Sequence, residues 1–307
     1  MSRAKKVAII TGGNRFVEFV LYSQSKKDQT LDQLIIVLAC RNLKKAQQAS
    51  DLLIKEYSND LLVVETLSLD TSDLDSVMSA AGEIQNRYEY VNYLFCNAGA
   101  MYIESLDWKS IAKGIFTHPI EFLGSTESLN QQVGLLSNQN LGLSFVTNFF
   151  GHYVLIKNII PCLAKAPIVR RVIWTGSNTS DHGFDSNDIQ HIHGVLLDTN
   201  VLKPYNIRSI VVEPGNVGTN ILNSLNSSVR FIFGVGRLTV TPWNGSYPSF
   251  YAFSQSDEKL DGKVKYYGNS TRLGTPYVEP VPIKYNLELA KDALNKIDAL
   301  AKEKNCL

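Results

Sequence analysis

The chain has 307 residues, of which 44% are hydrophobic and 19% are charged, and its formal net charge is +1. This is ordinary globular composition, sufficient for one large α/β domain or two small ones. Because the charge is nearly balanced and no long Lys/Arg-rich run is present, the sequence argues against nucleic acid as a partner.

Neither disulfides nor targeting segments are indicated. Four widely spaced cysteines lack a CxxC pair and a neighbouring His pair, which predicts reduced thiols and no metal site. The basic N-terminus is followed by only four apolar residues, Val7 to Ile10, too few for a signal peptide, so a buried first strand is predicted. No run approaches the roughly 18 apolar residues of a spanning helix. The cysteines are Cys40, Cys96, Cys162 and Cys306.

The first apolar run, Lys6 to Ile10, ends in the sequence TGGN at residues 11–14. A strand, glycines and a helical pattern in that order are how a dinucleotide-binding unit begins. Backbone N–H groups at the helix start face a pyrophosphate there, and glycine lets the phosphates come close. The next glycine after Gly13 is Gly82, so the later glycines of such a loop are missing. By itself TGGN fits a phosphate loop and a plain tight turn equally well.

The second apolar run, Leu34 to Ala39, is unbroken, as in a strand buried on both faces. Arg41 follows it. A basic residue at this point is placed to bind an adenosine 2′-phosphate, whereas an acidic residue would select NAD. The alternative is that Arg41 is only a solvated charge at a strand end. A helix is predicted next, from Leu43 to Tyr57.

Strands and helices continue to alternate up to residue 99. Leu61 to Leu69 predicts a strand ending at Asp70, a capped helix runs on to Tyr88, and Val91 to Phe95 predicts a strand ending in Asn97-Ala98-Gly99. This order predicts an α/β fold with a Rossmann-like doubly wound parallel sheet in a single domain. Ligands of such sheets bind at the carboxyl ends of the strands, where these polar turns fall.

The pattern loosens between residues 101 and 141, which are predicted to form a loop-rich insertion. Helical spacing returns from Asn140 to Cys162, a segment that contains Asn148. Tyr153 and Lys157 lie four residues apart in it, and such a pair can donate a proton to a carbonyl. Because this helix precedes the next strand and does not follow it, a structural role for the pair is favoured.

The stretch from Val169 to Asn220 contains two β-branched runs. The first closes at Ser177, and the second closes at Pro214 and Gly215, with Thr219 just beyond. The two runs predict a right-handed crossover between parallel strands. The helical candidate between them, Val195 to Lys203, would be about 13 Å long, shorter than a typical strand of about 17–20 Å.

Three weaker segments complete the chain. Arg230 to Val240 is apolar enough to lie on a membrane surface but too short to cross a bilayer. The Gly-, Pro- and aromatic-rich sequences TPWNGSY and KYYGNSTRLGTPYVEP are predicted to be loops. An amphipathic helix is predicted from Asn286 to Lys304. We therefore expect a main domain over residues 1–280 and a terminal helix over 281–307.

Together these motifs resemble the short-chain dehydrogenase/reductase family over most of residues 6–220. Within that family, ACRN, NYLFCNAG, TNFFGHYVLI and VIWTGS, with the later TPWNG and KYYGNSTRLGTPY, look most like the 3-keto-steroid reductases, so the likeness extends weakly to about residue 280. The resemblance implies NADPH as cofactor and a 3-keto group on a sterol or steroid as the group reduced. The motifs are TGGN (11–14), CRN (40–42), LD (69–70), NAG (97–99), TNFFGH (147–152), IWTGS (173–177) and PGNVGT (214–219).

The resemblance also implies roles for individual residues. Ser177 would hydrogen-bond the substrate carbonyl, and Asn148 would help to hold a proton-relay water. A tyrosine on the crossover helix would donate the proton, and a lysine one turn further would lower its pKa and bind the nicotinamide ribose. The implied cofactor-binding residues are Thr11, Gly12, Gly13, Asn14, Arg41, Asp70, Asn97, Ala98, Gly99, Pro214, Gly215 and Thr219.

The sequence departs from this family pattern on the crossover. No Tyr-x-x-x-Lys lies between Ser177 and Pro214, where Tyr205 is the one tyrosine. The phosphate loop and the stretch near Arg230 are also shortened, which indicates a variant transcript, a mis-assembled gene model or a decayed enzyme. Three functions remain open: the reductase itself, a catalytically impaired nucleotide- or sterol-binding or scaffold protein, and a reductase whose acid is His191 or His193.

Partners and location are also expected from the resemblance. It implies a sterol or steroid substrate, contacts with other sterol-synthesis enzymes, a homodimer and peripheral contact with a membrane. The expected location is the cytosolic face of the endoplasmic reticulum, with the cytoplasm as the alternative.

Overall fold

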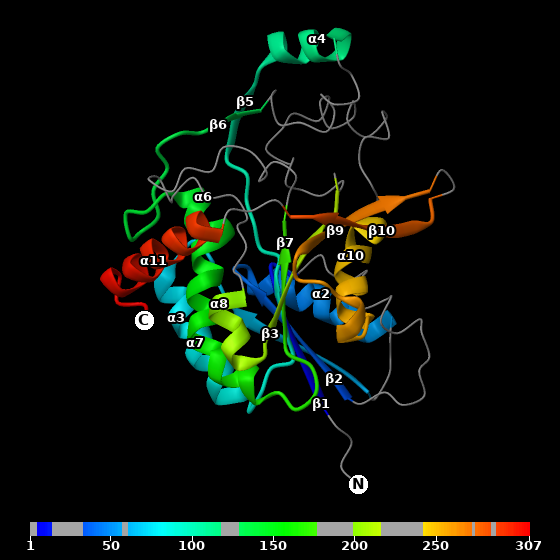
Figure 1. Ribbon diagram of the computed structural model, residues 1–307, viewed down its shortest axis with the longest axis vertical. Coiled ribbons are helices and arrows are strands. Elements are labelled where there is room, and N and C mark those ends of the chain that lie inside the picture. The colour runs from blue at the N-terminus through cyan, green and yellow to red at the C-terminus, as the bar shows by residue number, and fades with distance from the viewer. Residues whose placement is uncertain are drawn as a thin grey trace.

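The computed structural model describes residues 5–13, 33–56, 61–117, 129–176, 199–215, 242–271, 274–283 and 287–307. Within these ranges an eight-stranded sheet has the order β10-β9-β8-β7-β4-β1-β2-β3, parallel throughout except that β10 runs antiparallel to β9 (Figure 1). The predicted Rossmann-like α/β fold is confirmed. The strands are β1 (Lys5–Thr11), β2 (Gln33–Cys40), β3 (Leu62–Ser68), β4 (Tyr93–Cys96), β7 (Arg171–Thr175), β8 (Arg208–Glu213), β9 (Val264–Ser270) and β10 (Pro276–Pro282).

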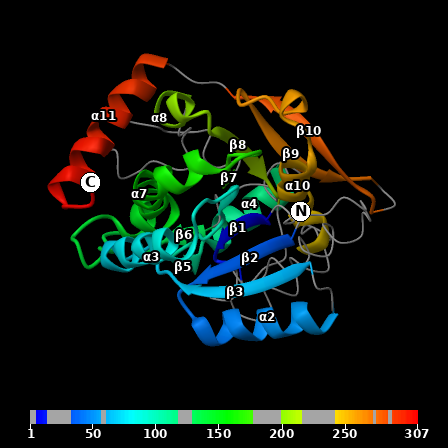
Figure 2. The same ribbon diagram turned by 90° about the horizontal axis from the view of Figure 1, so that it is seen from below.

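Helices cover both faces of the sheet (Figure 2). Helices α2 and α10 pack on one face, and α3, α7, α8 and α11 pack on the other. Successive strand residues therefore enter different cores: Ile9 belongs to the cluster beneath α3 and α7, and Ile10 to the one beneath α2 and α10. The helices are α2 (Leu43–Glu56), α3 (Leu74–Arg87), α7 (Gly151–Lys165), α8 (Thr199–Leu202), α10 (Pro242–Ser254) and α11 (Leu287–Glu303).

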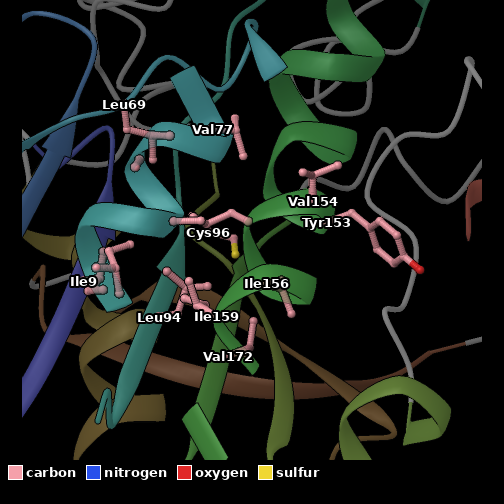
Figure 3. Packing of buried hydrophobic residues seen from close by; sticks show 14 of the residues in the cluster. Ile9, Leu69, Val77, Leu94, Cys96, Tyr153, Val154, Ile156, Ile159 and Val172 are labelled. Atoms are coloured by element: carbon pink, nitrogen blue, oxygen red, sulfur yellow. The ribbon is translucent and has the colours of Figure 1, made fainter. Parts of the chain in front are cut away.

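The core beneath α3 and α7 is the larger of the two, and Figure 3 shows how its side chains interlock. Leu94 of β4, Val77 of α3 and Ile159 of α7 have no exposed surface. Burial of such side chains contributes about 1.5–3 kcal/mol each, so this face fixes α7 against the strands. The first turn of α7 is thereby held at the carboxyl edge of the sheet.

The stretch predicted to be loop-rich contains regular structure of its own. Strands β5 (Ile103–Leu106) and β6 (Leu129–Gln131) form a separate antiparallel pair, and α4 (Trp108–Thr117) lies beyond them. Figure 1 shows this unit above the carboxyl ends of the parallel strands. Asp107 starts α4, because its side chain accepts hydrogen bonds from the backbone N–H groups of Lys109 and Ser110.

The prediction that TPWNGSY is a loop is wrong. Pro242 begins α10, a position where proline costs a helix little because its missing N–H would be unpaired anyway. The helix packs Phe250 and Ala252 into the core. Arg171 of β7 also binds the main-chain oxygens of Ala252, Phe253 and Gln255 at the end of α10. These long-range contacts override the weak helix propensity of the sequence.

The prediction that KYYGNSTRLGTPYVEP is a loop is also wrong, because this segment contains most of strands β9 and β10, which pair as a hairpin. Gly274 has a φ of +84°, which glycine adopts without strain, and it lies in the connection between the strands. Gly268 approaches α10 so closely that a Cβ there would lie 2.5 Å from the side chain of Pro248. The glycine that suggested a loop therefore marks the contact of a strand with a helix.

The predicted terminal helix is present as α11. It buries Ile297 and Ala301 against the same core as α7, and Asn305 ends it with a φ of +56°. In the parts of the chain that the structure describes, no helix is long and apolar enough to span a bilayer. Residues 230–240 lie outside the described residues.

Candidate active site

Polar turns follow five strands and lie at one edge of the sheet. Because β1, β2, β3, β4 and β8 are parallel, their carboxyl ends face the same way, where α/β proteins bind ligands. Three of the predicted site residues, Asn14, Ser177 and Thr219, lie outside the described residues. The predicted residues at this edge are Thr11, Gly12, Gly13, Arg41, Asp70, Asn97, Ala98, Gly99, Pro214 and Gly215.

The turns after β1 and β4 are in close contact. Gly12 has a φ of +65°, and a Cβ on it would lie 2.9 Å from the Cα of Ala98. Its N–H donates to the Ala39 carbonyl at 2.8 Å, which joins this turn to β2 as well. Only glycine fits here, because both the backbone conformation and the space exclude a side chain.

Thr11 joins the same two turns through its hydroxyl. The oxygen accepts hydrogen bonds from the N–H groups of Asn97 and Ala98, both at 2.9 Å. The Phe95 carbonyl lies 3.1 Å away and His152 Nε2 lies 2.8 Å away. Since the two amides occupy both lone pairs, the single hydroxyl proton serves the carbonyl and the imidazole, and Nε2 acts as an acceptor.

His152 is therefore a neutral part of this network. Burial lowers its pKa to about 4, an effect that the main-chain carbonyl of Asn148 partly opposes. The ring also meets Trp174 edge-on, with centroids 5.9 Å apart. Sequence reasoning missed His152, although its position four residues after Asn148 places both on one face of the helix.

Asn148 lies in a π-helical turn, Val146–Phe150, that leads into α7. Its side chain binds the backbone of Ala100 twice: Oδ1 accepts from the N–H at 2.7 Å, and Nδ2 donates to the carbonyl at 3.0 Å. The side chain thus holds the loop after Gly99 in place. Widened helical turns of this kind frequently occur at functional sites.

Arg41 and Asp70 lie side by side beyond β2 and β3. Asp70 Oδ1 accepts hydrogen bonds from the N–H and the hydroxyl of Ser72, so this carboxylate shapes its own turn. Arg41 Nη1 lies 3.8 Å from Asp70 Oδ2, and its side chain is 76% exposed. An exposed ion pair at this distance contributes little, so the guanidinium can turn towards a phosphate.

These features fit a dinucleotide. Gly12 itself carries no side chain at the end of β1, and the exposed guanidinium of Arg41 follows the end of β2, where such sheets bind the adenosine end of a dinucleotide. Within the described ranges, no three His, Cys, Asp or Glu residues are grouped so as to hold a metal ion.

The side chains of Tyr153 and Lys157 face α11 and not the turns at this edge. The Tyr153 hydroxyl donates to Asp298 of α11, and Lys157 Nζ forms an ion pair with the same carboxylate at 3.0 Å. Figure 3 shows Tyr153 pointing away from the side chains around Cys96. Burial and Asp298 raise the pKa of Tyr153. Through Asp298, the Tyr153 and Lys157 side chains thus hold α11 against α7.

Tyr205 lies at the opposite edge of the sheet. It ends a short 3₁₀ turn, Lys203–Tyr205, just before β8, and its carbonyl accepts a hydrogen bond from Arg170 at the start of β7. It is therefore remote from the carboxyl ends of the strands. His191 and His193, the other suggested acids, lie outside the described residues.

No family model matches the chain. Among curated proteins, it is 31% identical over 301 residues to the 3-keto-steroid reductase/17-beta-hydroxysteroid dehydrogenase 7 of Rattus norvegicus, covering 90% of this chain and 89% of that protein. It is 28% identical to the protein of the same name from Homo sapiens, covering 97% and 94%. The 3-keto-steroid reductase of Saccharomyces cerevisiae is 29% identical, covering 90% and 88%. The chain belongs to the 3-keto-steroid reductase family.

Solved structures agree on the fold of this reductase family member. An alcohol dehydrogenase from Thermococcus sibiricus complexed with 5-hydroxy-NADP has a TM-score of 0.55 at 14% identity, covering 86% of this chain and 96% of that one. Salutaridine reductase from Papaver somniferum has a TM-score of 0.54 at 16% identity, covering 85% and 99%. Family membership confirms the resemblance predicted from the motifs and makes the chain an oxidoreductase by descent.

Proposed function

We propose that this chain reduces a 3-keto group on a sterol or steroid, with NADPH as the hydride source. The observation that carries the proposal is the 31% identity over 90% of the chain to a 3-keto-steroid reductase. The relatives reported above all bear reductase names, and none is named as a binding or scaffold protein. A catalytically impaired role therefore has no support among them.

The residues of the carboxyl edge have separate tasks in this proposal. The turn at Gly12 lets the pyrophosphate approach the backbone, and Arg41 binds the 2′-phosphate that distinguishes NADPH from NADH. Thr11 and Asn148 bind protein backbone and keep the turns at residues 97–100 in shape. Such prior fixing of a site lowers the ordering cost of binding.

The reaction itself is a hydride transfer coupled to a proton transfer. The reduced nicotinamide supplies the hydride when bound, and the carbonyl carbon of the substrate receives it. Ser177 is proposed to hydrogen-bond the carbonyl oxygen, which then takes a proton from an acid of the protein.

The test is isotope transfer by the purified chain. NADPH carrying deuterium at the transferred position is incubated with a 4-methyl-3-keto sterol, and the product is analysed by mass spectrometry. The proposal predicts a 3-hydroxy sterol with deuterium at C3. Protein that is folded by circular dichroism and binds NADPH, yet forms no deuterated alcohol, would contradict it.

Location and assembly remain proposals drawn from the same likeness. We propose that the chain works at the cytosolic face of the endoplasmic reticulum, in peripheral contact with the membrane and with other sterol-synthesis enzymes, as a homodimer. Fractionation of cells would test the location. Recovery with the membranes and release by a salt wash would support peripheral contact, whereas recovery in the soluble fraction before any wash would favour the cytoplasm.

A further inference from the structure

The proposed reduction requires a proton donor, which the crossover between β7 and β8 does not supply as a Tyr-x-x-x-Lys pair. Four of the described tyrosines lie far from the carboxyl edge or donate their hydroxyl proton to another residue. Tyr90 and Tyr205 lie at the amino edge of the sheet, and Tyr153 donates to Asp298. Tyr102 is nearer, but it lies 3.0 Å from the hydroxyl of Thr147, which donates its own proton to Leu143. Tyr102 therefore donates to Thr147.

Tyr267 of β9 is in a different position. It is paired with Glu213, the last residue of β8, so it stands at the carboxyl edge beside Pro214 and Gly215. A Cβ on Gly215 would lie 3.8 Å from the Tyr267 hydroxyl. The hydroxyl is thus next to a turn whose sequence the family pattern assigns to cofactor binding. The side chain is only partly buried, so a ligand can reach it.

The sheet also presents Tyr267 on the appropriate face. Val211, two residues before Glu213, packs into the core beneath α7, whereas Val212 packs into the opposite core. Tyr267 therefore lies on the face that carries α7 and α8, where a crossover helix runs. About 10 Å, two strand spacings, separates its strand from β7, which leads through Gly176 to Ser177.

A buried ion pair stands beside Tyr267 on this face. Lys265 precedes it by two residues, and Lys265 Nζ lies 2.7 Å from Glu213 Oε2, with side chains only 10% and 4% exposed. Burial raises the pKa of Tyr267, Glu213 and Glu279 raise it further, and the Lys265 ammonium opposes them. The hydroxyl consequently keeps its proton at neutral pH and has a cation close by.

We propose that Tyr267 is the proton donor of the reduction and that Lys265 and Glu213 position its hydroxyl. This inference rests on the proposed function. The carbonyl carbon gains a hydride from the reduced nicotinamide, and the carbonyl π electrons move to the oxygen, which takes the Tyr267 proton and becomes the alcohol. The tyrosinate is stabilised by the ammonium of Lys265 and regains its proton from water. The net change is one ketone reduced, one nicotinamide oxidised and one proton consumed.

The activity test compares Tyr267→Phe with Tyr266→Phe. Tyr266 is the neighbouring residue on the opposite face, where its hydroxyl accepts a hydrogen bond from the Asp261 N–H, so it is a control for changes to β9. Removal of the acid should lower kcat by about 10²–10⁴-fold, whereas Tyr266→Phe should retain the wild-type kcat. The dissociation constant of NADPH, measured by fluorescence, should be the same in both variants and the wild type. A wild-type kcat in Tyr267→Phe would overturn the inference. So would a loss of activity in Tyr102→Phe when Tyr267→Phe remains active.

A second measurement does not depend on turnover. The absorbance of tyrosinate is titrated against pH, and subtraction of the Tyr267→Phe curve isolates Tyr267. Lys265→Met should move this titration to higher pH and Glu213→Gln to lower pH, because each removes one of the charges beside the hydroxyl. A curve unchanged by both substitutions would overturn the positioning role. If the titration curve shifts in these variants but the wild-type protein reduces no sterol ketone, both the proposed function and the catalytic role of Tyr267 are wrong. If Tyr267→Phe reduces the ketone as fast as the wild type, only the inference about Tyr267 is wrong.

Discussion

Two regions of this molecule are stabilised in different ways. The turns around Thr11, residues 97–100 and Asn148 are held by hydrogen bonds to backbone groups and by glycines that let segments approach. The β7–β10 region with α10 is held by buried charges, Arg171 in one core and the Lys265–Glu213 pair on the other face. Contacts in both regions join residues far apart in sequence. The first region is held by neutral hydrogen bonds and glycine turns, whereas the second depends on buried charges.

The largest expected effect is in the second region. Arg171 is 2% exposed and binds Asp257 and three main-chain oxygens around the end of α10. Arg171→Leu leaves these acceptors unpaired and should lower the free energy of unfolding by about 3–5 kcal/mol. Arg208→Leu is the matched control, because Arg208 contacts the same carboxylate from a position 42% exposed and should cost at most about 1 kcal/mol. Equal losses in urea titrations would contradict this account.

The first region should respond next most strongly, to Thr11→Val. The valine leaves the N–H groups of Asn97 and Ala98 without their acceptor, at about 1 kcal/mol for each group, because both are only partly buried. Thr11→Ser keeps the hydroxyl, so its free energy of unfolding should fall only slightly. We expect the valine variant also to bind NADPH more weakly, because the turn at 97–99 is no longer fixed. Unfolding and fluorescence titrations measure the two effects, and equal stability of both variants would refute the role of the hydroxyl.

Because His152 belongs to the same network, the free energy of unfolding should depend on pH. The pKa of His152 is about 4 in the folded protein, below its usual value of 6.5. Above pH 6.5 the imidazole is neutral in both states. As the pH falls, the unfolded chain binds the proton first, so stability is lost between pH 6.5 and 4. At pH 5 this amounts to roughly 2 kcal/mol, at 1.36 kcal/mol for each pH unit.

His152→Gln removes this titration and provides the comparison. The difference in unfolding free energy between the variant and the wild type should change by that amount between pH 7 and pH 5, while the carboxylates common to both cancel. A difference that is the same at both pH values would show that His152 does not titrate in this way.

The smallest expected effect concerns Arg41, which is exposed and contributes little to folding. Arg41→Ala should weaken NADPH binding about tenfold, or 1.4 kcal/mol, and leave NADH binding and stability unchanged. Lys55→Ala, which removes the same charge from the last turn of α2, is the control. Equal weakening of NADPH binding in both variants would indicate a general charge effect and no 2′-phosphate site.

The sequence predicts the first region well, because its signals are local. TGGN, NAG and the unbroken runs at Leu34–Ala39 and Val91–Phe95 place strands and turns where the structure has them. It does not show that Thr11 reaches His152, a contact across 141 positions. Periodicity describes one segment at a time and carries no information on which distant group completes a hydrogen bond.

The second region was predicted less well for the same reason. Gly, Pro and aromatic residues suggested loops at 241–247 and 265–280, because propensity favours turns there. Arg171 binding and the packing of Gly268 against Pro248 instead stabilise a helix and a hairpin. Lys265, Glu213 and Tyr267 come together only when β8 and β9 pair, so no spacing in the sequence could indicate that cluster.

The most direct test of the account is NADPH oxidation by the purified chain in the presence and absence of a 4-methyl-3-keto sterol. The account predicts oxidation that depends on the sterol and stops when the ketone is exhausted. Folded protein that binds NADPH but oxidises it at the same rate with and without the sterol would contradict it.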